Sequence, residues 1–309
     1  MPEATQREAS SSASRCGFVA IIGAPNVGKS TLVNALVGSK ISIVTPKVQT
    51  TRMLIRGIAV EGQTQLILVD TPGIFAPRRR LDRAMVDSAW AGSRDADLIV
   101  LVVDANKGVR DDDEAIVSGL AGMPAVKILA LNKIDLVAKP KLLDLAQALN
   151  DCAAFAATFM ISARSADGVT DLKSFLATHL PAGPWLYPPD QISDAPLRQF
   201  AAEVTREKLY LRLHQELPYQ SAVETVVWKE LNDGSVRIEQ TIYVERESQR
   251  KIVLGKGGQT IKAIGAAARN EIAAAVERPV HLFLFVKGRE HWADDPERYR
   301  EMGLEFPKG

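Results

Sequence analysis

The feature that most constrains this chain is a glycine-rich octapeptide between an apolar run and a helix-like stretch. Its residues are Gly23-Ala24-Pro25-Asn26-Val27-Gly28-Lys29-Ser30, followed by Thr31, and they match the pattern G-x-x-x-x-G-K-[ST]. Glycines let backbone N–H groups curl around phosphates, and the start of the next helix adds partial positive charge. Lys29 is expected to neutralise the β and γ phosphates, and Ser30 to give its hydroxyl to Mg²⁺. The octapeptide therefore predicts a nucleotide-binding domain.

Strand-like and helix-like segments alternate around this loop. Strands are expected at Gly17–Ile22, Met53–Val60, Gln65–Val69, Leu98–Val103, Ala125–Leu131 and Thr158–Ile161. The second and third flank the turn Glu61-Gly62-Gln63 and form a hairpin, and plausible helices precede the later strands. This order predicts an α/β fold with a six-stranded, mostly parallel sheet covered on both faces. Phosphate chemistry in such a sheet belongs at the carboxyl ends of the strands.

The tetrapeptide Asn132-Lys133-Ile134-Asp135 follows an apolar strand and selects the base. Asp135 is expected to accept hydrogen bonds from the N1–H and exocyclic amine of guanine. Adenine offers neither in that geometry, so it would leave the carboxylate unpaired at high cost. Asn132 is expected to form hydrogen bonds with the loop and with the base. The aliphatic stem of Lys133 is expected to cover the face of the base. Ser162-Ala163-Arg164, after the last strand, is expected to support the guanine. The nucleotides are therefore predicted to be GTP and GDP.

Asp70-Thr71-Pro72-Gly73 ends the second strand of the hairpin and is expected to lie near the γ-phosphate. Asp70 can hold Mg²⁺ through water, and the Gly73 N–H can sense the γ-phosphate. Lys29 and Gly73 are the expected catalytic residues. Ile74 comes next, and an isoleucine cannot orient water by hydrogen bonding.

The polar, turn-rich segment Thr45–Arg52 is typical of a loop that becomes ordered when the γ-phosphate and Mg²⁺ bind. Either Thr50 or Thr51 is expected to supply a further metal ligand from this loop. The sequence does not separate the two threonines.

Pro181-Ala182-Gly183-Pro184 and Pro188-Pro189 break the alternating pattern and suit a semi-rigid linker. Beyond them a helix is expected at Leu197–Leu213 and a hairpin around Asn232-Asp233-Gly234. A G-x-x-G loop lies between helical segments, and the strand Val280–Val286 follows. The expected domains are a disordered arm (1–15), a nucleotide domain (16–181), a linker (182–196) and a smaller α+β domain with a C-terminal tail (197–309).

The G-x-x-G loop is the candidate site in the second domain. Its glycines allow close approach of a nucleic-acid backbone. Residues 245–270 carry six basic and two acidic side chains, although the whole chain has a net charge of only +1, so the positive charge is local. The alternative is a simple turn between helices. The expected RNA contacts are Arg250, Lys251, Gly255, Lys256, Gly257, Gly258 and Lys262.

These motifs carry a resemblance. Residues 17–181 resemble a translation-factor-type GTPase in which Ile74 stands where Ras-like GTPases carry a water-positioning glutamine. Related GTPases use an asparagine at the position of Asn26 to hold K⁺. The order helix, hairpin, G-x-x-G helix pair and strand matches a bacterial-type (type II) KH domain. The two together resemble the Era family of ribosome-assembly GTPases.

The resemblance implies slow intrinsic hydrolysis of GTP with Mg²⁺, and binding near the 3′ end of small-subunit ribosomal RNA during late assembly of the small subunit. It also implies some association with the inner face of the cell membrane. Arg78-Arg79-Arg80 are candidates for contact with RNA or lipid, the alternative being a solvated face. The chain is expected to be cytoplasmic, because two cysteines form no disulfide framework and no apolar run reaches the length of a membrane span. It is also expected to be a monomer.

Two alternative functions compete with that of an Era-type GTPase. One is a pure RNA-binding module that has lost hydrolysis, which Ile74 permits and the intact Lys29, Ser30, Asp70 and Gly73 oppose. The other is a tRNA-modification GTPase, which would carry different flanking domains and a C-terminal cysteine.

Overall fold

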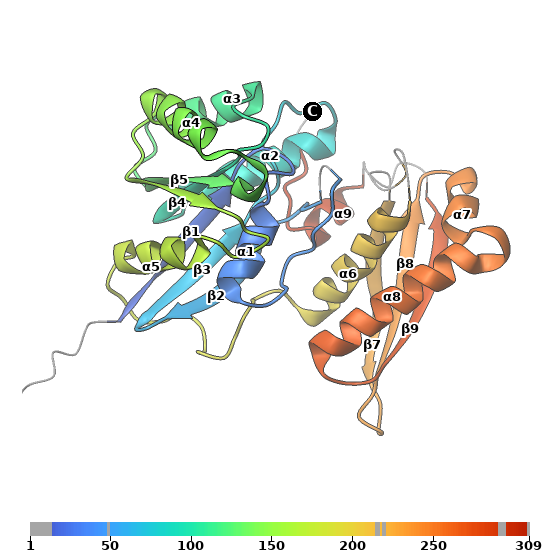
Figure 1. Ribbon diagram of the computed structural model, residues 1–309. Coiled ribbons are helices and arrows are strands. Elements are labelled where there is room, and N and C mark those ends of the chain that lie inside the picture. The colour runs from blue at the N-terminus through green and yellow to red at the C-terminus, as the bar shows by residue number, and fades with distance from the viewer. Residues whose placement is uncertain (1–13, 48–49, 214–216, 218–220, 290–294, 308–309) are drawn as a thin grey trace, which may run out of the picture.

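The computed structural model describes residues 14–47, 50–213, 217, 221–289 and 295–307. It contains an N-terminal α/β domain and a smaller C-terminal α+β domain, which lie beside each other (Figure 1). Residues 1–13, which make up most of the arm expected at the N-terminus, lie outside the described residues.

A six-stranded sheet forms the centre of the N-terminal domain. Its order is β2-β3-β1-β4-β5-β6, with β2 antiparallel to β3 and all other neighbours parallel. β3 and β4 are buried along their whole length, as expected for central strands covered on both faces. The predicted fold class is confirmed. The strands are β1 (Arg15–Ile22), β2 (Ile55–Glu61), β3 (Thr64–Asp70), β4 (Leu98–Asp104), β5 (Val126–Asn132) and β6 (Ala157–Ile161).

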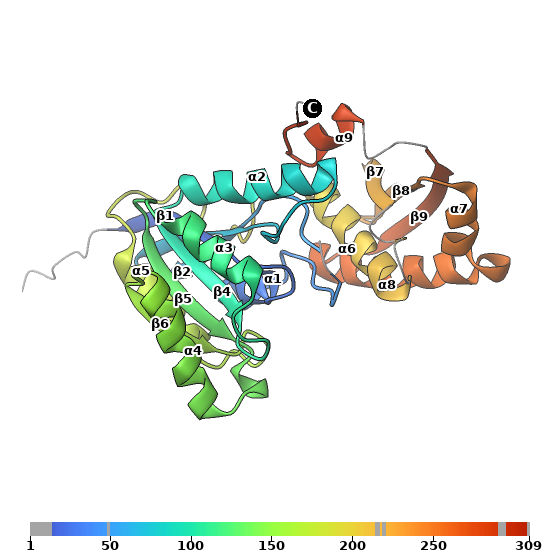
Figure 2. The same cartoon turned by 90° about the horizontal axis from the view of Figure 1, so that it is seen from above.

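The helices of this domain cover both faces of the sheet (Figure 2). They are α1 (Lys29–Val37), α2 (Arg80–Arg94), α3 (Asp111–Leu120), α4 (Lys139–Cys152) and α5 (Val169–His179), with a short 3₁₀ helix, η1, at Ile134–Leu136. α1 and α5 contact each other and pack on β2 and β3, whereas α2 packs on β1. The chain passes through α1 on its way from β1 to β2, and through α2 on its way from β3 to β4. These two connections therefore cross the sheet in opposite directions. Right-handed crossovers therefore place these two helices on opposite faces.

The parallel strands bring four loops to one edge of the sheet. β1, β3, β5 and β6 end at Ile22, Asp70, Asn132 and Ile161. Because these strands point the same way, the loops after them meet at the carboxyl edge. Every motif identified in the nucleotide domain follows one of these strand ends.

The C-terminal domain has a three-stranded sheet in the order β7-β8-β9. β7 and β8 form an antiparallel hairpin, and β9 runs parallel to β8. Helices α6 and α8 pack on each other, α6 on β7 and α8 on β9, and bury a core that includes Val204, Ile238 and Ile272. The elements are α6 (Leu197–Arg212), β7 (Ser221–Glu230), β8 (Val236–Val244), α7 (Glu247–Leu254), a 3₁₀ turn η2 (Lys256–Gly258), α8 (Gln259–Val276), β9 (Val280–Gly288) and α9 (Pro296–Glu301).

Two further segments join the domains. The connection between α5 and α6 runs along the edge strand β2, where the Ile58 N–H donates to the Ile192 carbonyl at 2.9 Å. At the end of the chain, Tyr299 of α9 and Leu304 pack against Leu81 and Met85 of α2. Both segments contact the nucleotide domain, so non-covalent contacts as well as the covalent connection hold the two domains together.

The elements differ from those expected by one or two residues at most ends. Helix α9 begins at Pro296, a residue type suited to the first helical position, and Asp295 Oδ1 accepts the Glu297 N–H at 3.0 Å. Within the described ranges, none of the helices has both the length and the apolar character that crossing a bilayer requires.

Candidate nucleotide site and glycine loop

A cavity of about 620 Å³ opens at the carboxyl edge of the sheet. Residues from all four strand-end loops line it, together with residues from the segment between α1 and β2. The predicted site residues in its wall are Pro25, Asn26, Gly28, Lys29, Ser30, Thr31, Thr50, Thr51, Gly73, Asn132, Lys133, Asp135, Ser162, Ala163 and Arg164. The remaining predicted residues, Gly23, Ala24, Val27, Asp70, Thr71, Pro72 and Ile74, are buried.

Lys29 lies at the base of the phosphate loop with 6% of its surface exposed. Its ammonium group donates to the Gly23 carbonyl at 3.0 Å and the Ala24 carbonyl at 2.9 Å. Burial lowers the pKa of Lys29 to about 8, and the carboxylates of Asp70 and Asp113 partly oppose that shift. The loop therefore surrounds a buried cation at the start of α1, where an anion is favoured.

The two threonines that the sequence left unresolved occupy different surroundings. Thr51 Oγ1 lies 2.8 Å from Ser30 Oγ and 3.5 Å from Asp70 Oδ2. Thr50 Oγ1 instead donates to the Lys47 carbonyl at 2.7 Å and lies 2.7 Å from Thr45 Oγ1. Thr51 is therefore the threonine that lies with Ser30 and Asp70.

Asp70 is fully buried beside these hydroxyls. Burial raises its pKa, while hydrogen bonding from Ser30 and the charge of Lys29 act in the opposite direction. Its Oδ1 atom has no hydrogen-bond partner in the described part of the chain. A buried carboxylate oxygen without a partner is costly, and a cation would satisfy it.

The segment after β3 is fastened to the phosphate loop. The Thr71 hydroxyl donates to the Ile21 carbonyl at 2.8 Å, and the Ile74 N–H donates to the Gly23 carbonyl at 3.1 Å. The Ile74 side chain is 5% exposed and belongs to the core of the domain. Ile74 therefore serves as a packing residue.

The loop after β5, which the sequence predicts to recognise the base (the base-recognition loop), is fixed by Asn132. Its Nδ2 donates to the Val27 carbonyl at 2.8 Å, and its Oδ1 accepts the Lys133 and Ala163 N–H groups at 2.8 and 2.9 Å. One side chain thus ties together the phosphate loop and the loops after β5 and β6. Asp135 lies in η1 with its side chain exposed in the cavity wall.

Asp104 is a residue that the sequence reasoning missed. It ends β4, is 2% exposed, and forms an ion pair with Lys133 Nζ at 2.6 Å. The same ammonium group donates to the Asn26 carbonyl at 2.7 Å. An acidic residue at the carboxyl end of a buried strand, as at Asp70, is the signal that would have found it.

The glycine loop of the C-terminal domain turns between α7 and α8. Gly255 has a φ of +72°, and a Cβ atom there would lie 2.2 Å from Thr260 Oγ1, so a side chain does not fit. Lys251, Lys256 and Lys262 are exposed beside the turn. Arg250 differs from the other predicted contacts, because it forms an ion pair with Glu247 at 2.7 Å and donates to the Val286 carbonyl at 3.2 Å.

Comparison with known proteins assigns both halves of the chain. Residues 18–133 match the family described as 50S ribosome-binding GTPase, and residues 216–293 match the KH domain. GTPase Era of Afipia carboxidovorans is 68% identical over 294 residues, which cover 95% of this chain and 96% of that protein. GTPase Era of a Bradyrhizobium species is 66% identical over 303 residues, which cover 98% and 99%. The chain belongs to the GTPase Era family.

Solved Era structures share the whole architecture. Era in complex with MgGDPNP and nucleotides 1506–1542 of 16S ribosomal RNA aligns with a TM-score of 0.89 and 36% identity. A variant of Aquifex aeolicus Era bound to GDP·AlF4⁻ aligns with a TM-score of 0.89 and 37% identity. Each alignment covers 94% of this chain and 99% of the other.

Family membership decides between the functions that the sequence left open. As a member of the Era family, the chain is a GTPase rather than a pure RNA-binding module. The KH domain and the full-length similarity to Era also argue against a tRNA-modification GTPase.

The role of Asp135 gives a prediction about base choice. Asp135→Asn replaces an acceptor of two hydrogen bonds by an amide, which should weaken GTP binding by about 3 kcal/mol, roughly a hundredfold. The variant should favour xanthosine triphosphate, whose C2 carbonyl accepts a hydrogen bond. Fluorescent-nucleotide competition measures both affinities, with Asp144→Asn on the exposed part of α4 as the control. An unchanged preference in the Asp135 variant would exclude this role.

Proposed function

We propose that this Era-family GTPase uses GTP and GDP as the two states of a switch that binds the 3′ region of small-subunit ribosomal RNA and assists assembly of the small ribosomal subunit. The observation that carries the proposal is the presence, in one chain, of a cavity lined by the residues predicted to bind a guanine nucleotide and of an exposed KH glycine loop. The Era structure that aligns over 94% of this chain holds MgGDPNP and 16S ribosomal RNA together, which supports the same pair of ligands.

Mg²⁺ is the first cofactor of the proposed mechanism. Ser30, Thr51 and Asp70 converge on one point, and the buried Asp70 Oδ1 has no partner among the described groups. Oxygen ligands of this kind suit Mg²⁺. Bound there, Mg²⁺ would neutralise charge on the β and γ phosphates. Thr51 is the proposed ligand from its loop, because the hydroxyl of Thr50 bonds within the loop.

Hydrolysis is proposed to depend on positioning and charge. Lys29 would exchange its loop carbonyls for phosphate oxygens, and the Gly73 N–H would contact the γ-phosphate. Ile74 is packed in the core and has no group that orients water, so no side-chain base is assigned. The intrinsic rate is therefore expected to be slow in the absence of a helper.

K⁺ is a second proposed cofactor, at Asn26. This residue has a φ of +64°, and its Nδ2 donates to the Pro46 carbonyl at 3.1 Å. A K⁺ ion would contact the amide oxygen, because an amide NH₂ group is a donor and does not bind a cation. A cation there would lie between the phosphate loop and the loop that carries Thr51.

RNA is proposed to bind along the KH glycine loop. Lys251, Lys256 and Lys262 supply charge for the phosphates, and Ile252, 57% exposed, supplies an apolar surface for splayed bases. Arg250 is expected to contribute less than these lysines, since its guanidinium already pairs with Glu247.

A cytoplasmic monomer that touches the inner face of the membrane stays a prediction from the family resemblance. The arginines after β3 have structural contacts that compete with a lipid or RNA role. The Arg80 guanidinium lies 5.0 Å from the Phe306 ring centroid, and the backbone N–H of Arg79 donates to Asp82 at 3.0 Å, which fixes the start of α2 and leaves the guanidinium of Arg79 out of that bond. The glycine loop is therefore the first candidate for RNA, and Arg78–Arg80 the second.

The metal site predicts unequal effects for two adjacent threonines. Thr51→Ala removes a proposed ligand and should weaken Mg²⁺ binding by about 10- to 100-fold. Thr50→Ala is the matched control, because it removes only hydrogen bonds within the loop. Titration of phosphate release with Mg²⁺ measures the difference. A larger loss in Thr50→Ala than in Thr51→Ala would reverse the assignment.

The proposed K⁺ site predicts cation-dependent turnover. The parent protein should hydrolyse GTP faster in K⁺ than in Na⁺, and Asn26→Ala should lose that difference while it still binds nucleotide. Asn150→Ala, at the far end of α4, is the control. Phosphate release is measured at equal ionic strength in both salts. Equal rates for the parent protein would leave Asn26 a structural residue that holds Pro46.

The RNA site predicts a loss of binding without a loss of fold. Replacing Lys256 and Gly257 by aspartates adds charge that repels phosphate and bulk that blocks it. A Cβ atom at Gly257 meets open space, and aspartate tolerates its positive φ. RNA binding should therefore be abolished, whereas thermal stability and GTP affinity should not change. Binding by the parent protein should weaken only modestly with salt, since the local excess of charge is small.

A charge-matched variant, Lys141→Asp with Gly122→Asp, makes the same change on the surface of the GTPase domain, where Gly122 is also open at positive φ. Filter binding to a 16S 3′-end oligonucleotide compares the two. If the loop variant binds as the parent does, the glycine loop is only a turn between helices.

A further inference from the structure

The loop that carries Thr51 is in contact with the KH domain on both sides of that residue. We define the switch loop as residues 38–54, of which 48 and 49 lie outside the described part. It leaves α1, passes α6 of the KH domain and enters β2 (Figure 2). Its polar contacts with the KH domain come from Lys40, Val44, Lys47, Thr50, Arg52 and Met53.

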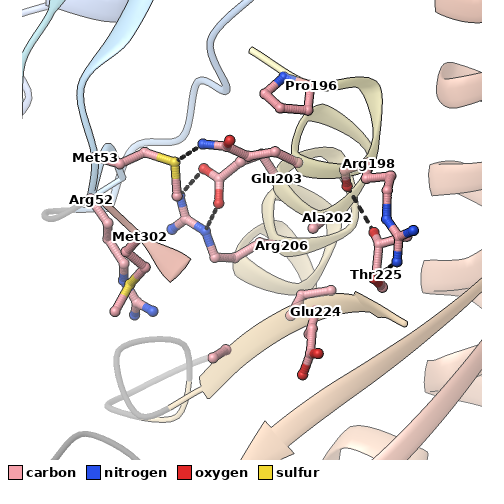
Figure 3. A pocket seen from close by; sticks show the side chains of 13 residues that line it. Arg52, Met53, Pro196, Arg198, Ala202, Glu203, Arg206, Glu224, Thr225 and Met302 are labelled. Atoms are coloured by element: carbon pink, nitrogen blue, oxygen red, sulfur yellow. Dashed lines mark hydrogen bonds and ion pairs between the residues drawn. The ribbon is translucent and has the colours of Figure 1, made fainter. Parts of the chain in front are cut away.

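Arg206 of α6 makes the contact next to Thr51. Its Nη2 donates to the Thr50 carbonyl and its guanidinium also pairs with Glu203 one turn earlier. Figure 3 shows this guanidinium extending from α6 toward Arg52 and Met53, bound to Glu203. Arg206 is only 2% exposed, and its guanidinium lies 5.1 Å from the ring centroid of Tyr210. The donor is thus held in place before it meets the switch loop.

Arg52 makes the contact on the other side of Thr51. Its guanidinium donates to the Ser221 carbonyl of β7 and to the Tyr210 hydroxyl of α6, both at 2.8 Å. Arg52 is also 2% exposed. The residues before and after Thr51 are therefore both bound by buried groups of the KH domain.

A second cluster holds the earlier part of the switch loop. Glu207 of α6 accepts the Val44 N–H at 2.8 Å and pairs with Lys40 at 2.7 Å. Lys40 also pairs with Glu271 of α8 at 2.5 Å. This cluster is less buried at Lys40, whose side chain is 35% exposed.

The interface between these contacts is not continuously packed. A cavity of about 340 Å³ lies between Arg52 and Met53 of the switch loop, α6 and β7 (Figure 3). The hydrogen bonds of Arg206 and Arg52 connect the KH domain and the switch loop beside this cavity. Arg198 lines the same cavity, but its guanidinium donates to the carbonyls of Thr225 and Val226 within the KH domain.

We propose that Arg206 is a positioning residue for GTP hydrolysis: through the Thr50 carbonyl it holds the backbone that directs Thr51 toward Ser30 and Asp70. The inference rests on the proposed metal site. The KH domain then stabilises the switch-loop conformation that binds Mg²⁺ and the γ-phosphate. GDP has no γ-phosphate, so its affinity depends less on this conformation.

The test uses the full-length chain with Arg206→Gln and, as the matched control, Arg198→Gln from the same helix and cavity. Hydrogen exchange of the peptide over residues 50–55 is measured without nucleotide or metal. Arg206→Gln should accelerate it by about tenfold, the effect of losing one charge-assisted hydrogen bond, and Arg198→Gln should not. The affinity for Mg²⁺ with a non-hydrolysable GTP analogue should fall by about five- to tenfold, and that for GDP by less than about twofold.

A conservative variant covers the case in which Arg206→Gln does not fold. Arg206→Lys keeps a positive charge beside Glu203, but its single ammonium group reaches Glu203 or Thr50 less well than a guanidinium reaches both. It should show the same changes at a smaller size. The proposal is overturned if a folded Arg206 variant has the same hydrogen-exchange rate and the same affinity for the GTP analogue as the parent protein. It is also overturned if the variant loses affinity for the GTP analogue and for GDP equally.

Thr51→Ala separates this inference from the metal site on which it rests. If Thr51→Ala loses Mg²⁺ affinity while the Arg206 variants behave as the parent does, the metal site stands and only the positioning role is wrong. If Thr51→Ala has no effect, the proposed metal site itself is wrong, and the positioning role fails with it.

Discussion

The buried charge of Lys29 is the constraint on which the nucleotide site depends. The ammonium group of a lysine that is only 6% exposed must be surrounded by acceptors, and the Gly23 and Ala24 carbonyls supply them. The loop can curl this tightly because Gly28 has a φ of +102°, and a Cβ atom there would lie 2.3 Å from the Asn132 amide. The same amide binds the Val27 carbonyl and so connects the phosphate loop to the base-recognition loop. Carbonyls are weaker partners for an ammonium than phosphate oxygens are, so a nucleotide would replace them with a net gain.

Much of this arrangement could be predicted from the sequence, because it is built from local patterns. The buried strands are continuous apolar runs, and each motif directly follows a strand end, so the topology of a parallel sheet alone brings the motifs together. Asp104 was missed because it belongs to no motif, although it lies at the same kind of strand end as Asp70. Arg250 was expected to contact RNA because of its charge, but the ion pair with Glu247 depends on the side-chain geometry of α7.

The choice between Thr50 and Thr51 could not be predicted for a different reason. Two adjacent residues of an irregular loop differ only in the direction that the backbone gives them, and no periodic pattern fixes that direction. Here the backbone is held from the KH domain, more than 150 residues later, by Arg206 and by the groups that bind Arg52. In the sequence, Glu203, Arg206 and Glu207 look like the polar face of an ordinary helix. These three residues are only between 2% and 8% exposed, and they become buried only when that face meets the switch loop.

The C-terminal half of the chain also reaches the second segment near the γ-phosphate. Helix α2 follows the Asp70–Gly73 segment, and Tyr299, Leu304 and Phe306 pack against its first turns. The switch loop therefore contacts residues beyond the linker directly, and the Asp70–Gly73 segment is followed by a helix that contacts them. A ligand that changes the position of either segment must change the free energy of these contacts. By thermodynamic reciprocity, if bound nucleotide changes the affinity of the KH domain for a ligand by some factor, that ligand changes the affinity for the nucleotide by the same factor. The contacts at Thr50 and α2 would thus give RNA bound at the proposed glycine-loop site a physical route to the nucleotide site.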